Sequence, residues 1–362
     1  MGVAQRLALR GLGRVAPNPS VGCLIVNAGR VIGRGHTEPS GRPHAETVAL
    51  AQAGEAARGA TAYVTLEPCA HTGKTSPCAD ALITAGVSRV VIACQDPDPR
   101  VSGRGIERLI EAGVSVALGV GQDDALRANA GFLLTICHGR PLFSLKSATS
   151  LDGKIATNTG HSQWITGEDA RDRGHLLRAT HDAILIGSET ALADNPLLSC
   201  RLPGMGDRSP LRVILDSSGR TLDSNLELIE AGATPTWVFV AQGAAITQPP
   251  APHKVFEVAQ DIAGRPSALG VAQRLAEEGI TRVLIEGGAA IAAAFLQANL
   301  IDHVHTFRAP FHIGADGHAS IEAMGLTDLN NAHRFTRTHL ETLGADVYEA
   351  FERENLLGLL AD

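Results

Sequence analysis

Four side chains near the start of the chain have the types and spacing of a metal site with its own acid and base. His44 and Glu46 lie two residues apart at the beginning of an Ala-rich apolar run, and Cys69 and Cys78 follow in the next polar loop. Zinc prefers imidazole and thiolate ligands in a tetrahedral arrangement, and a catalytic zinc keeps three protein ligands and one open position. His44, Cys69 and Cys78 are therefore the candidate zinc ligands.

Glu46 gives this candidate site a chemistry. Zinc lowers the pKa of bound water to roughly 7, and a carboxylate beside it can take that proton and deliver it to a leaving amine. The order His-x-Glu, then Pro-Cys, then a second Cys is similar to the signature of zinc-dependent cytidine and nucleobase deaminases, in which the Glu is not a ligand. Here eight residues separate Cys69 from Cys78, where that signature has about two. A purely structural zinc site would need a fourth ligand, for which His71 is the candidate.

The surrounding elements indicate how these residues are brought together. Pro43 opens an apolar run that predicts a helix to about Ala57, so His44 and Glu46 fall in its first turn. The same patterns predict a helix over 4–13, a hairpin of strands 21–27 and 30–35, a strand over 61–66, a helix over 78–85, strands over 89–93 and 114–118, and helices over 106–112 and 123–134. Such alternation is typical of an α/β sheet covered by helices.

The segment from His138 to Pro141 (HGRP) has the composition of a linker, so we expect one domain over residues 1–140 and a second over 141–362. The alternation restarts at Leu142. It predicts strands over 142–148, 183–187, 211–216, 236–240, 281–286 and 303–309, and helices over 168–179, 188–193, 267–278 and 288–298. The second domain is therefore also expected to be α/β.

Composition excludes several classes of protein. Charged residues make up 19% of the 362, and no run of 18 or more apolar residues favours a membrane span. The N-terminus lacks the apolar segment and cleavage site of a signal peptide. Residues 1–140 carry a net charge of +3 and the remainder −10, without the basic surplus of a nucleic-acid binder. This charge balance is compatible with a small anionic substrate. The six scattered cysteines do not form a disulfide framework, so we expect a reducing cytoplasm.

Motifs in both halves resemble one family, the bifunctional riboflavin-biosynthesis deaminase-reductases. In the first half these are PNPSVGCLIV, GRPHAE, TAYVTLEPCAHTGKTSPC and QDPDPRVSGRG; in the second they are LKSATSLDGKIA, SQWITG, AILIGSETALADNPLLSCR, RVILDS and IEGGAAIAAAFL. The resemblance implies a cytidine-deaminase-like three-layer domain followed by a dihydrofolate-reductase-like domain. The wider spacing of the two cysteines is a property of this family.

The resemblance also implies two reactions, cofactors and site residues. The first domain would deaminate 2,5-diamino-6-(5-phosphoribosylamino)pyrimidin-4-one with zinc, and the second would reduce the ribosyl side chain to ribityl with NADPH. NADPH would contact Ala148, Trp164, Thr190, Asp194, Ser217, Gly288, Ala289, Ala290, Ile291, Ala292, Ala293 and Ala294. Substrate would contact Ser162, Arg178, Leu198, Arg201 and Glu286. A homodimer or tetramer through the reductase half is implied as well.

The residues leave other points open. Ser20 and Ser76 stand where the family more often has Asn and Pro, respectively, and we expect these two differences to tune the substrate pocket. The first helix starts late, from which we expect that the chain lacks a few residues at its beginning. Glu286-Gly287-Gly288 between a strand and a helix is a candidate phosphate cradle, but no GxGxxG is present and no residue selecting NADPH over NADH is recognisable.

The reductase half also contains two polar residues without an assigned role. Lys146 and Asp152 are candidates for polar support of the reductase site.

Two alternative functions remain open on the residues alone. One is a deaminase of another base or nucleoside whose C-terminal half serves assembly only. The other is a zinc-stabilised binding protein without turnover.

Overall fold

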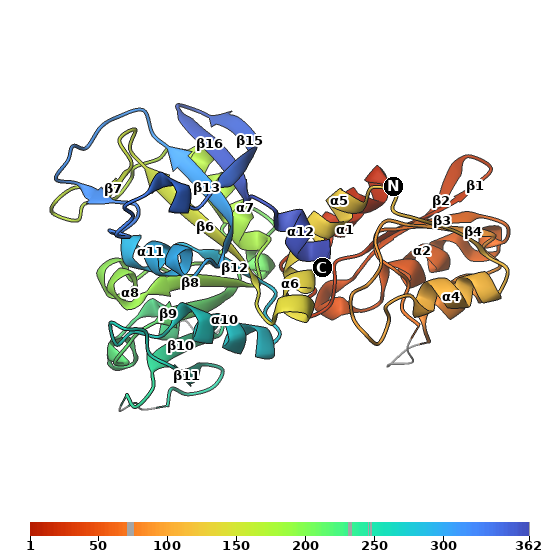
Figure 1. Ribbon diagram of the computed structural model, residues 1–362, viewed down its shortest axis with the longest axis horizontal. Coiled ribbons are helices and arrows are strands. Elements are labelled where there is room, and N and C mark those ends of the chain that lie inside the picture. The colour runs from red at the N-terminus through yellow and green to blue at the C-terminus, as the bar shows by residue number, and fades with distance from the viewer. Residues whose placement is uncertain (71–75, 231–233, 245, 247, 362) are drawn as a thin grey trace. The chain divides into compact units, whose positions relative to one another are not determined.

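The computed structural model describes residues 1–70, 76–230, 234–244, 246 and 248–361 (Figure 1). The chain divides into two compact units. The N-terminal unit comprises Met1–Gly139 together with Leu357–Asp362, and the C-terminal unit comprises Arg140–Leu356. Among the described residues, no helix is long and apolar enough to cross a membrane.

The N-terminal unit is built on a five-stranded sheet in the order β2-β1-β3-β4-β5. Strand β1 pairs antiparallel with β2 and β3, whereas β3, β4 and β5 run parallel. The strands are β1 (Gly22–Asn27), β2 (Arg30–His36), β3 (Thr61–Val64), β4 (Arg89–Ile92) and β5 (Ser115–Leu118). The helices are α1 (Gly2–Ala8), α2 (Ala45–Ala53), α3 (Cys78–Thr84), α4 (Arg104–Glu111), α5 (Gln122–Ala128) and α6 (Ala130–His138). Helices α2 and α4 lie on the same side of this sheet (Figure 1).

Two glycines let α2 lie close to the sheet. A Cβ atom at Gly35 would be 2.1 Å from the carbonyl oxygen of Ala45, and one at Gly33 would be 2.1 Å from that of Ala49. Both distances are far below van der Waals contact, so only glycine permits this approach. His44 and Glu46 lie at the first turn of α2. The close contact sets the distance between this turn and strand β2.

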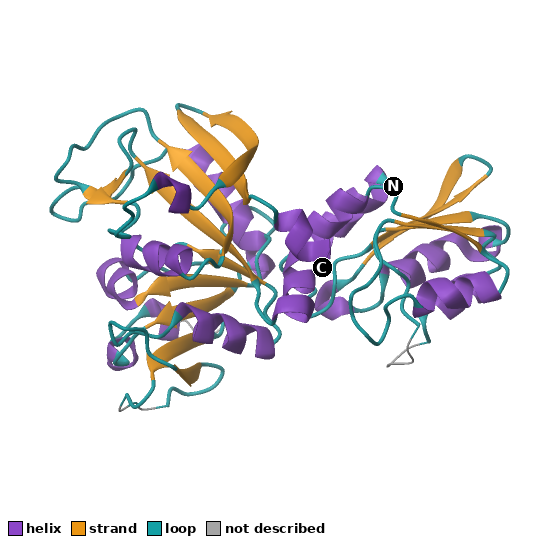
Figure 2. Cartoon of the chain, viewed as in Figure 1, coloured by secondary structure: helices purple, strands orange, loops and turns teal. Residues whose placement is uncertain are grey.

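The C-terminal unit contains a nine-stranded sheet in the order β11-β10-β9-β8-β12-β6-β13-β16-β15 (Figure 2). All neighbouring strands are parallel except β13–β16 and β15–β16. The strands are β6 (Leu142–Thr149), β8 (Ala183–Gly187), β9 (Leu211–Leu215), β10 (Thr236–Ala241), β11 (Lys254–Val258), β12 (Arg282–Ile285), β13 (Ile301–Arg308), β15 (Phe335–Leu343) and β16 (Asp346–Arg353), and a separate pair joins β7 (Lys154–Ala156) to β14 (His318–Ala319).

Helices cover both faces of the nine-stranded sheet. They are α7 (Glu168–Ala179), α8 (Ser188–Asp194), α9 (Glu227–Glu230), α10 (Ala268–Glu277) and α11 (Ala289–Gln297), whereas α12 (Leu356–Ala361) belongs from Leu357 onward to the N-terminal unit. Alternate residues of one strand join different cores: Leu185 packs with residues of α10 and α11, whereas Ile184 and Ile186 pack with Ala191 of α8. Burial on both faces is what a parallel sheet requires.

Most elements predicted from sequence are present. The hairpin, the helix carrying His44 and Glu46, and the strand-helix alternation of both halves are confirmed within a few residues. The helix predicted over 123–134 is two helices, α5 and α6, that meet at Asn129. The sequence patterns did not predict β7, α9, β11, β14, β15, β16 and α12. Five consecutive residues of β15 are exposed, so this strand lacks the apolar run that marks the central strands.

The end of the chain returns to the N-terminal unit. The imidazole Nε2 of His138 lies 2.8 Å from the carbonyl oxygen of Leu359, and the side chain of Leu360 is buried. Residues that follow the whole C-terminal unit in sequence therefore complete the packing of the N-terminal unit.

Arg140, within the predicted linker, is fixed rather than loose. Its Nη1 and Nη2 donate to the two carboxylate oxygens of Asp302 at 2.7 and 2.8 Å. Asp302 is fully buried and also accepts a hydrogen bond from the backbone N–H of Phe143. The C-terminal unit thus begins at a buried, bidentate ion pair that ties β6 to β13.

Replacing Asp302 with Ala should destabilise the C-terminal unit by about 3–5 kcal/mol, because the Arg140 guanidinium would stay buried without a counter-charge. Urea unfolding followed by circular dichroism measures this free energy. The matched control is Arg265→Met, which breaks an exposed pair with Asp261 and should cost at most about 0.5 kcal/mol. Equal effects of the two substitutions would contradict the structural role of the buried pair.

Candidate active sites

The structure brings His44, Cys69 and Cys78 together. His44 is the N-cap residue of α2, Cys78 begins α3, and Cys69 lies in the loop after β3. The Nδ1 atom of His44 is 3.3 Å from Sγ of Cys78 and 3.6 Å from Sγ of Cys69, and all three ligand atoms lie within 4.8 Å of one another. The candidate closing ligand, His71, lies outside the described residues.

The donor set and its dimensions fit a zinc ion. With zinc bonds of about 2.1 Å to nitrogen and about 2.3 Å to sulfur, tetrahedral geometry separates nitrogen and sulfur ligands by roughly 3.6 Å. The observed separations from His44 Nδ1 are close to that value. Of the described residues, this trio is the cluster of His, Cys and acidic groups that could hold a metal ion.

One of the two thiols is prepared for metal binding. Hydrogen bonding from the Cys78 side chain and the neighbouring His44 lower the pKa of the Cys69 thiol to about 4. The backbone N–H of Cys78 also donates to Cys69 Sγ at 3.3 Å. A thiolate is the form that binds zinc, so the local hydrogen bonds favour the ligand state of Cys69.

Glu46 lies beside the trio and is removed from water. Its side chain is only 3% exposed. Burial, reinforced by the negative charge of Cys69, raises the pKa of the Glu46 carboxyl to about 7. A carboxyl group with a pKa near neutrality can both accept and release a proton, which suits general acid-base catalysis.

Glu67 is a structural residue of this site that the sequence analysis did not identify. It lies in the Glu-Pro-Cys motif and is 3% exposed. Its carboxylate accepts hydrogen bonds from the backbone N–H groups of Asp96, Gly103, Gly105 and Ile106 at 2.8–3.3 Å. Glu67 therefore binds the 96–106 loop and the start of α4 next to Cys69. The sequence feature that could have identified Glu67 is its position directly before Pro-Cys, after a buried strand.

A second candidate site is a cavity of about 800 Å³ in the C-terminal unit. Its walls come from β6, the 160–166 segment, α7, α8, the 195–201 loop and the turn between β12 and α11. Gly287 and Gly288 line it at the start of the nine-residue helix α11, whose N-cap makes no side-chain hydrogen bond. Free N–H groups at a helix start attract phosphate, and the volume is typical of a cofactor pocket, so NADPH fits these residues.

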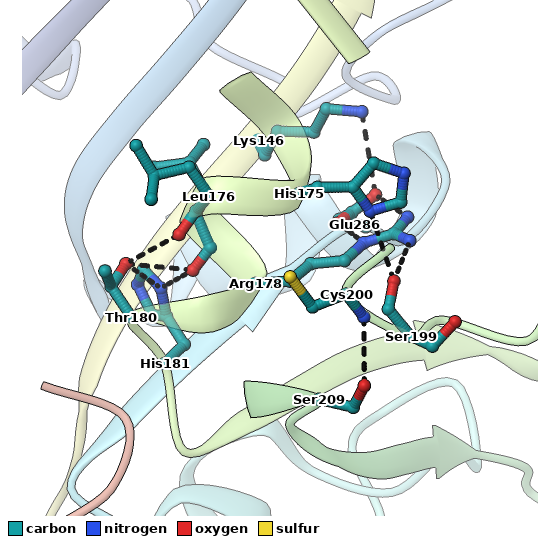
Figure 3. A network of polar contacts seen from close by, with 11 residues as sticks. Lys146, His175, Leu176, Arg178, Thr180, His181, Ser199, Cys200, Ser209 and Glu286 are labelled. Atoms are coloured by element: carbon teal, nitrogen blue, oxygen red, sulfur yellow. Dashed lines mark hydrogen bonds and ion pairs between the residues drawn. The ribbon is translucent and has the colours of Figure 1, made fainter. Parts of the chain in front are cut away.

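Several residues that line the cavity form an ion-pair network (Figure 3). Arg178 donates through Nε and Nη2 to the two carboxylate oxygens of Glu286 at 2.7 and 3.0 Å, and through Nη1 to the carbonyl oxygen of Ser199. Lys146 Nζ lies 3.6 Å from Glu286, and His175 Nδ1 lies 3.2 Å from the same Ser199 oxygen. Burial alone would raise the pKa of Glu286, but the charges of Arg178 and Lys146 outweigh it and lower that pKa to about 2.

Most residues implied for the reductase reaction line this cavity. They are Ala148, Ser162, Trp164, Arg178, Thr190, Asp194, Leu198, Arg201, Glu286, Gly288 and Ala289. The lining does not include Ser217 or the α11 residues from Ala290 to Ala294. Ala292 and Ala293 are buried, so their side chains serve the packing of α11. Ser217 follows β9, beyond the edge of the cavity.

The structure also places Lys146 and Asp152, the two candidates for polar support, and the second tryptophan of the chain. Lys146 lines the cavity beside Glu286. Asp152 instead stabilises a turn, accepting hydrogen bonds from Ser150 and from the backbone N–H groups of Ile313 and Gly314. The other tryptophan, Trp237, is buried in the core against Phe256.

Comparison with known proteins assigns both units. The family model of the cytidine and deoxycytidylate deaminase zinc-binding region matches residues 1–94, and that of the RibD C-terminal domain matches residues 141–348. The riboflavin biosynthesis protein RibD of Bacillus amyloliquefaciens is 40% identical over 96% of this chain and 94% of that protein. RibD of Escherichia coli is 39% identical over 96% of both chains.

Solved structures agree over nearly the whole chain. Acinetobacter baumannii RibD superposes with a TM-score of 0.87 at 39% identity, covering 97% of both chains. A diaminohydroxyphosphoribosylaminopyrimidine deaminase/5-amino-6-(5-phosphoribosylamino)uracil reductase from Thermotoga maritima gives a TM-score of 0.86 at 35% identity, covering 98% of this chain and 97% of that one. The N-terminal unit thus has the cytidine-deaminase-like fold, and the C-terminal unit has the dihydrofolate-reductase-like fold of RibD.

The two matched regions occur in one chain, in the order found in these relatives, and a zinc-binding deaminase region precedes an NADPH-dependent reductase domain. The chain belongs to the RibD family of bifunctional riboflavin-biosynthesis enzymes, which deaminate a phosphoribosylated diaminopyrimidine and then reduce its ribosyl side chain.

Proposed function

We propose that His44, Cys69 and Cys78 hold the zinc ion of the deaminase and that Glu46 is its proton carrier. The observation that carries this assignment is the convergence of one imidazole nitrogen and two sulfur atoms within 4.8 Å, next to a buried carboxyl group. The substrate is 2,5-diamino-6-(5-phosphoribosylamino)pyrimidin-4-one, whose 2-amino group is replaced by oxygen. We assign this reaction to residues 1–140 and the reduction to 141–362, although the last residues pack with the first unit.

Held by His44, Cys69 and Cys78, a zinc ion would lower the pKa of a water molecule toward neutrality and so provide the nucleophile. The Glu46 carboxylate accepts the proton that the attacking water gives up. The resulting carboxylic acid then donates it to the 2-amino nitrogen, which leaves as ammonia. Because Glu46 is buried, bulk water does not compete for that proton.

In the reductase, we assign NADPH contacts to Ala148, Trp164, Thr190, Asp194, Ser217, Gly288, Ala289, Ala290, Ile291, Ala292, Ala293 and Ala294, and substrate contacts to Ser162, Arg178, Leu198, Arg201 and Glu286. The cavity that collects most of these residues supports the assignment. The backbone N–H groups at the start of α11 are the groups that would hold the pyrophosphate.

NADPH supplies the hydride that reduces the ribosyl group. The protein side chains have different tasks. Each nitrogen atom of Arg178 donates one hydrogen bond to Glu286 or Ser199, so Arg178 orients Glu286 and keeps one N–H on each of Nη1 and Nη2 for substrate contact. Arg201 is exposed on the cavity wall and is the better phosphate ligand, since a guanidinium can donate two parallel hydrogen bonds.

The alternative functions are weaker. A C-terminal half serving assembly only has no need for a cavity of about 800 Å³ with a buried Arg178–Glu286 pair on its wall. A zinc-stabilised binding protein has no need for a carboxyl group buried beside an open metal position, because burying it costs free energy.

We also propose that the protein works in a reducing cytoplasm as a homodimer or tetramer. The six cysteines are free, and Cys69 and Cys78 must remain reduced to bind zinc. Strand β15 is a nine-residue sheet edge with exposed side chains, which suits association through the reductase unit. Light scattering that gives the mass of a single chain would overturn the oligomer.

Replacing Glu46 with Gln should lower the deaminase rate by about 10²–10⁴-fold, because the amide cannot carry the proton. Zinc content and reduction of the already deaminated substrate should stay unchanged. Ammonia release, metal analysis and NADPH oxidation measure the three properties. Glu55→Gln, at an exposed glutamate nearby, is the control and should leave all three intact. Undiminished deamination with zinc bound would refute the role of Glu46.

Removal of zinc should separate the two reactions. A chelator should abolish deamination and leave the reduction of supplied deaminated substrate intact, because the cavity of the C-terminal unit contains no cluster of zinc ligands among its described residues. Readdition of zinc should restore ammonia release. Deamination by protein in which metal analysis finds no zinc would contradict the proposed chemistry.

Replacing Arg178 with Met should raise the pKa of Glu286 from about 2, because burial then acts without its main counter-charge. An ionised Glu286 stabilises the fold above its unfolded pKa of about 4.3, and this contribution is lost as pH falls through the folded pKa. In the variant the folded and unfolded pKa values lie closer together, so less stability should be lost as the pH falls from about 7 to about 3 than in the wild type. Urea unfolding between pH 3 and pH 7 (a range of about four units) measures the shift, and an unchanged pH profile would contradict it.

A further inference from the structure

The carboxyl ends of β8 and β9 carry a polar cluster at the border of the cavity described above. The two strands are parallel neighbours in which Gly187 lies opposite Leu215, so the residues that follow them leave the sheet at the same edge. Ser188 and Glu189 follow β8, and the 216–220 turn follows β9. Ligands of open α/β sheets bind at this edge.

Arg220 is held in this cluster by one end of its side chain. Its Nη2 atom donates to Ser188 Oγ at 2.9 Å and to Glu189 Oε1 at 2.7 Å. Among the contacts of the described residues, Nε and Nη1 have no acceptor, and half of the side chain is exposed. The guanidinium is thus oriented but retains the donors needed to bind a phosphate group.

The turn that carries Arg220 is itself fixed. Buried Asp216 accepts hydrogen bonds from the backbone N–H and the hydroxyl of Thr221, both at 2.7 Å. Gly219 adopts the left-handed conformation, with a φ of 78°, that turns the chain back toward α8. A cation on such a turn is placed with little loss of entropy when a ligand binds.

The cluster continues the NADPH cavity. Glu189 and Thr190 line that cavity, and Thr190 Oγ1 lies 3.8 Å from the position that a Cβ atom of Gly288 would occupy. Arg220 pairs with Glu189 and is therefore next to this part of the cavity wall. With the pyrophosphate at Gly288, an adenosine ribose beside Glu189 would present its 2′-phosphate to Arg220.

We propose that Arg220 binds the 2′-phosphate of NADPH and thereby makes the reductase prefer NADPH over NADH. The two cofactors differ only in this phosphate, so a cation at the adenosine ribose discriminates between them by charge. The Glu189 side chain is 86% exposed, so its ion pair with Arg220 is weak. The phosphate can therefore replace the Glu189 carboxylate as the partner of Arg220. This inference rests on the proposed reductase function of the cavity.

The test is binding of 2′,5′-ADP and 5′-AMP, measured by calorimetry on the full-length protein. Arg220→Gln should weaken 2′,5′-ADP by about 10–100-fold, the value of a charged hydrogen-bonded contact, and leave 5′-AMP unchanged. The KM for NADPH should rise by the same factor with kcat unchanged, while the KM for NADH stays constant. Arg265→Gln, at an exposed arginine paired with Asp261, is the control.

Glu189→Gln separates phosphate binding from a structural role of the Arg220 pair. It removes the competing carboxylate, so 2′,5′-ADP should bind as tightly as in the wild type or more tightly. Equal losses in Arg220→Gln and Glu189→Gln, or unchanged 2′,5′-ADP binding in Arg220→Gln, would overturn the proposal. If the wild type bound neither NADPH, followed by quenching of Trp164, nor 2′,5′-ADP, the reductase function itself would fail.

Discussion

The cost of taking a carboxylate out of water shapes both active sites. Several kcal/mol are lost for each ion buried without a partner, so every buried acid needs an arranged environment. The carboxylate of Glu286 is paired with two cationic side chains, and that of Glu67 accepts hydrogen bonds from four backbone N–H groups. The carboxylate of Asp302 forms a bidentate ion pair with an arginine. For Glu46, burial and the charge of Cys69 outweigh the stabilising contacts, and its pKa rises to about 7. The buried acid with the least compensation is the one that we propose as the proton carrier.

The two sites use different scaffolding. The metal site is gathered from three consecutive pieces of chain: the start of α2, the loop after β3 and the start of α3. Close approach of α2 over Gly33 and Gly35 places the first piece. The reductase cavity instead draws on β6, α7, α8 and β12, which are spread along the chain from Leu142 to Ile285. Its shape depends on the whole parallel sheet.

This difference explains what sequence could predict. His44, Glu46, Cys69 and Cys78 were recognisable because zinc chemistry restricts ligand type and spacing within a short stretch. In the reductase half, residue assignments came from family motifs, and the pairing of Arg178 with Glu286 has no local signal. The hairpin of β15 and β16 was missed because exposed edge strands alternate weakly, and Glu67 was missed because its partners are backbone groups of a distant loop. The role proposed for Arg220 could not be predicted from sequence either, because it depends on β8 and β9 being neighbouring strands.

The return of the chain end to the N-terminal unit has a consequence for biosynthesis. Residues 1–139 leave the ribosome first, but the segment that packs against His138 follows the whole C-terminal unit. At about 5–20 residues per second, that unit takes roughly 10–40 s to translate. During this interval the deaminase half exposes the apolar surface that Leu360 later covers. The N-terminal unit can therefore complete its packing only after the C-terminal unit has been translated. A chain released early from the ribosome would contain an N-terminal unit that lacks its last packing segment.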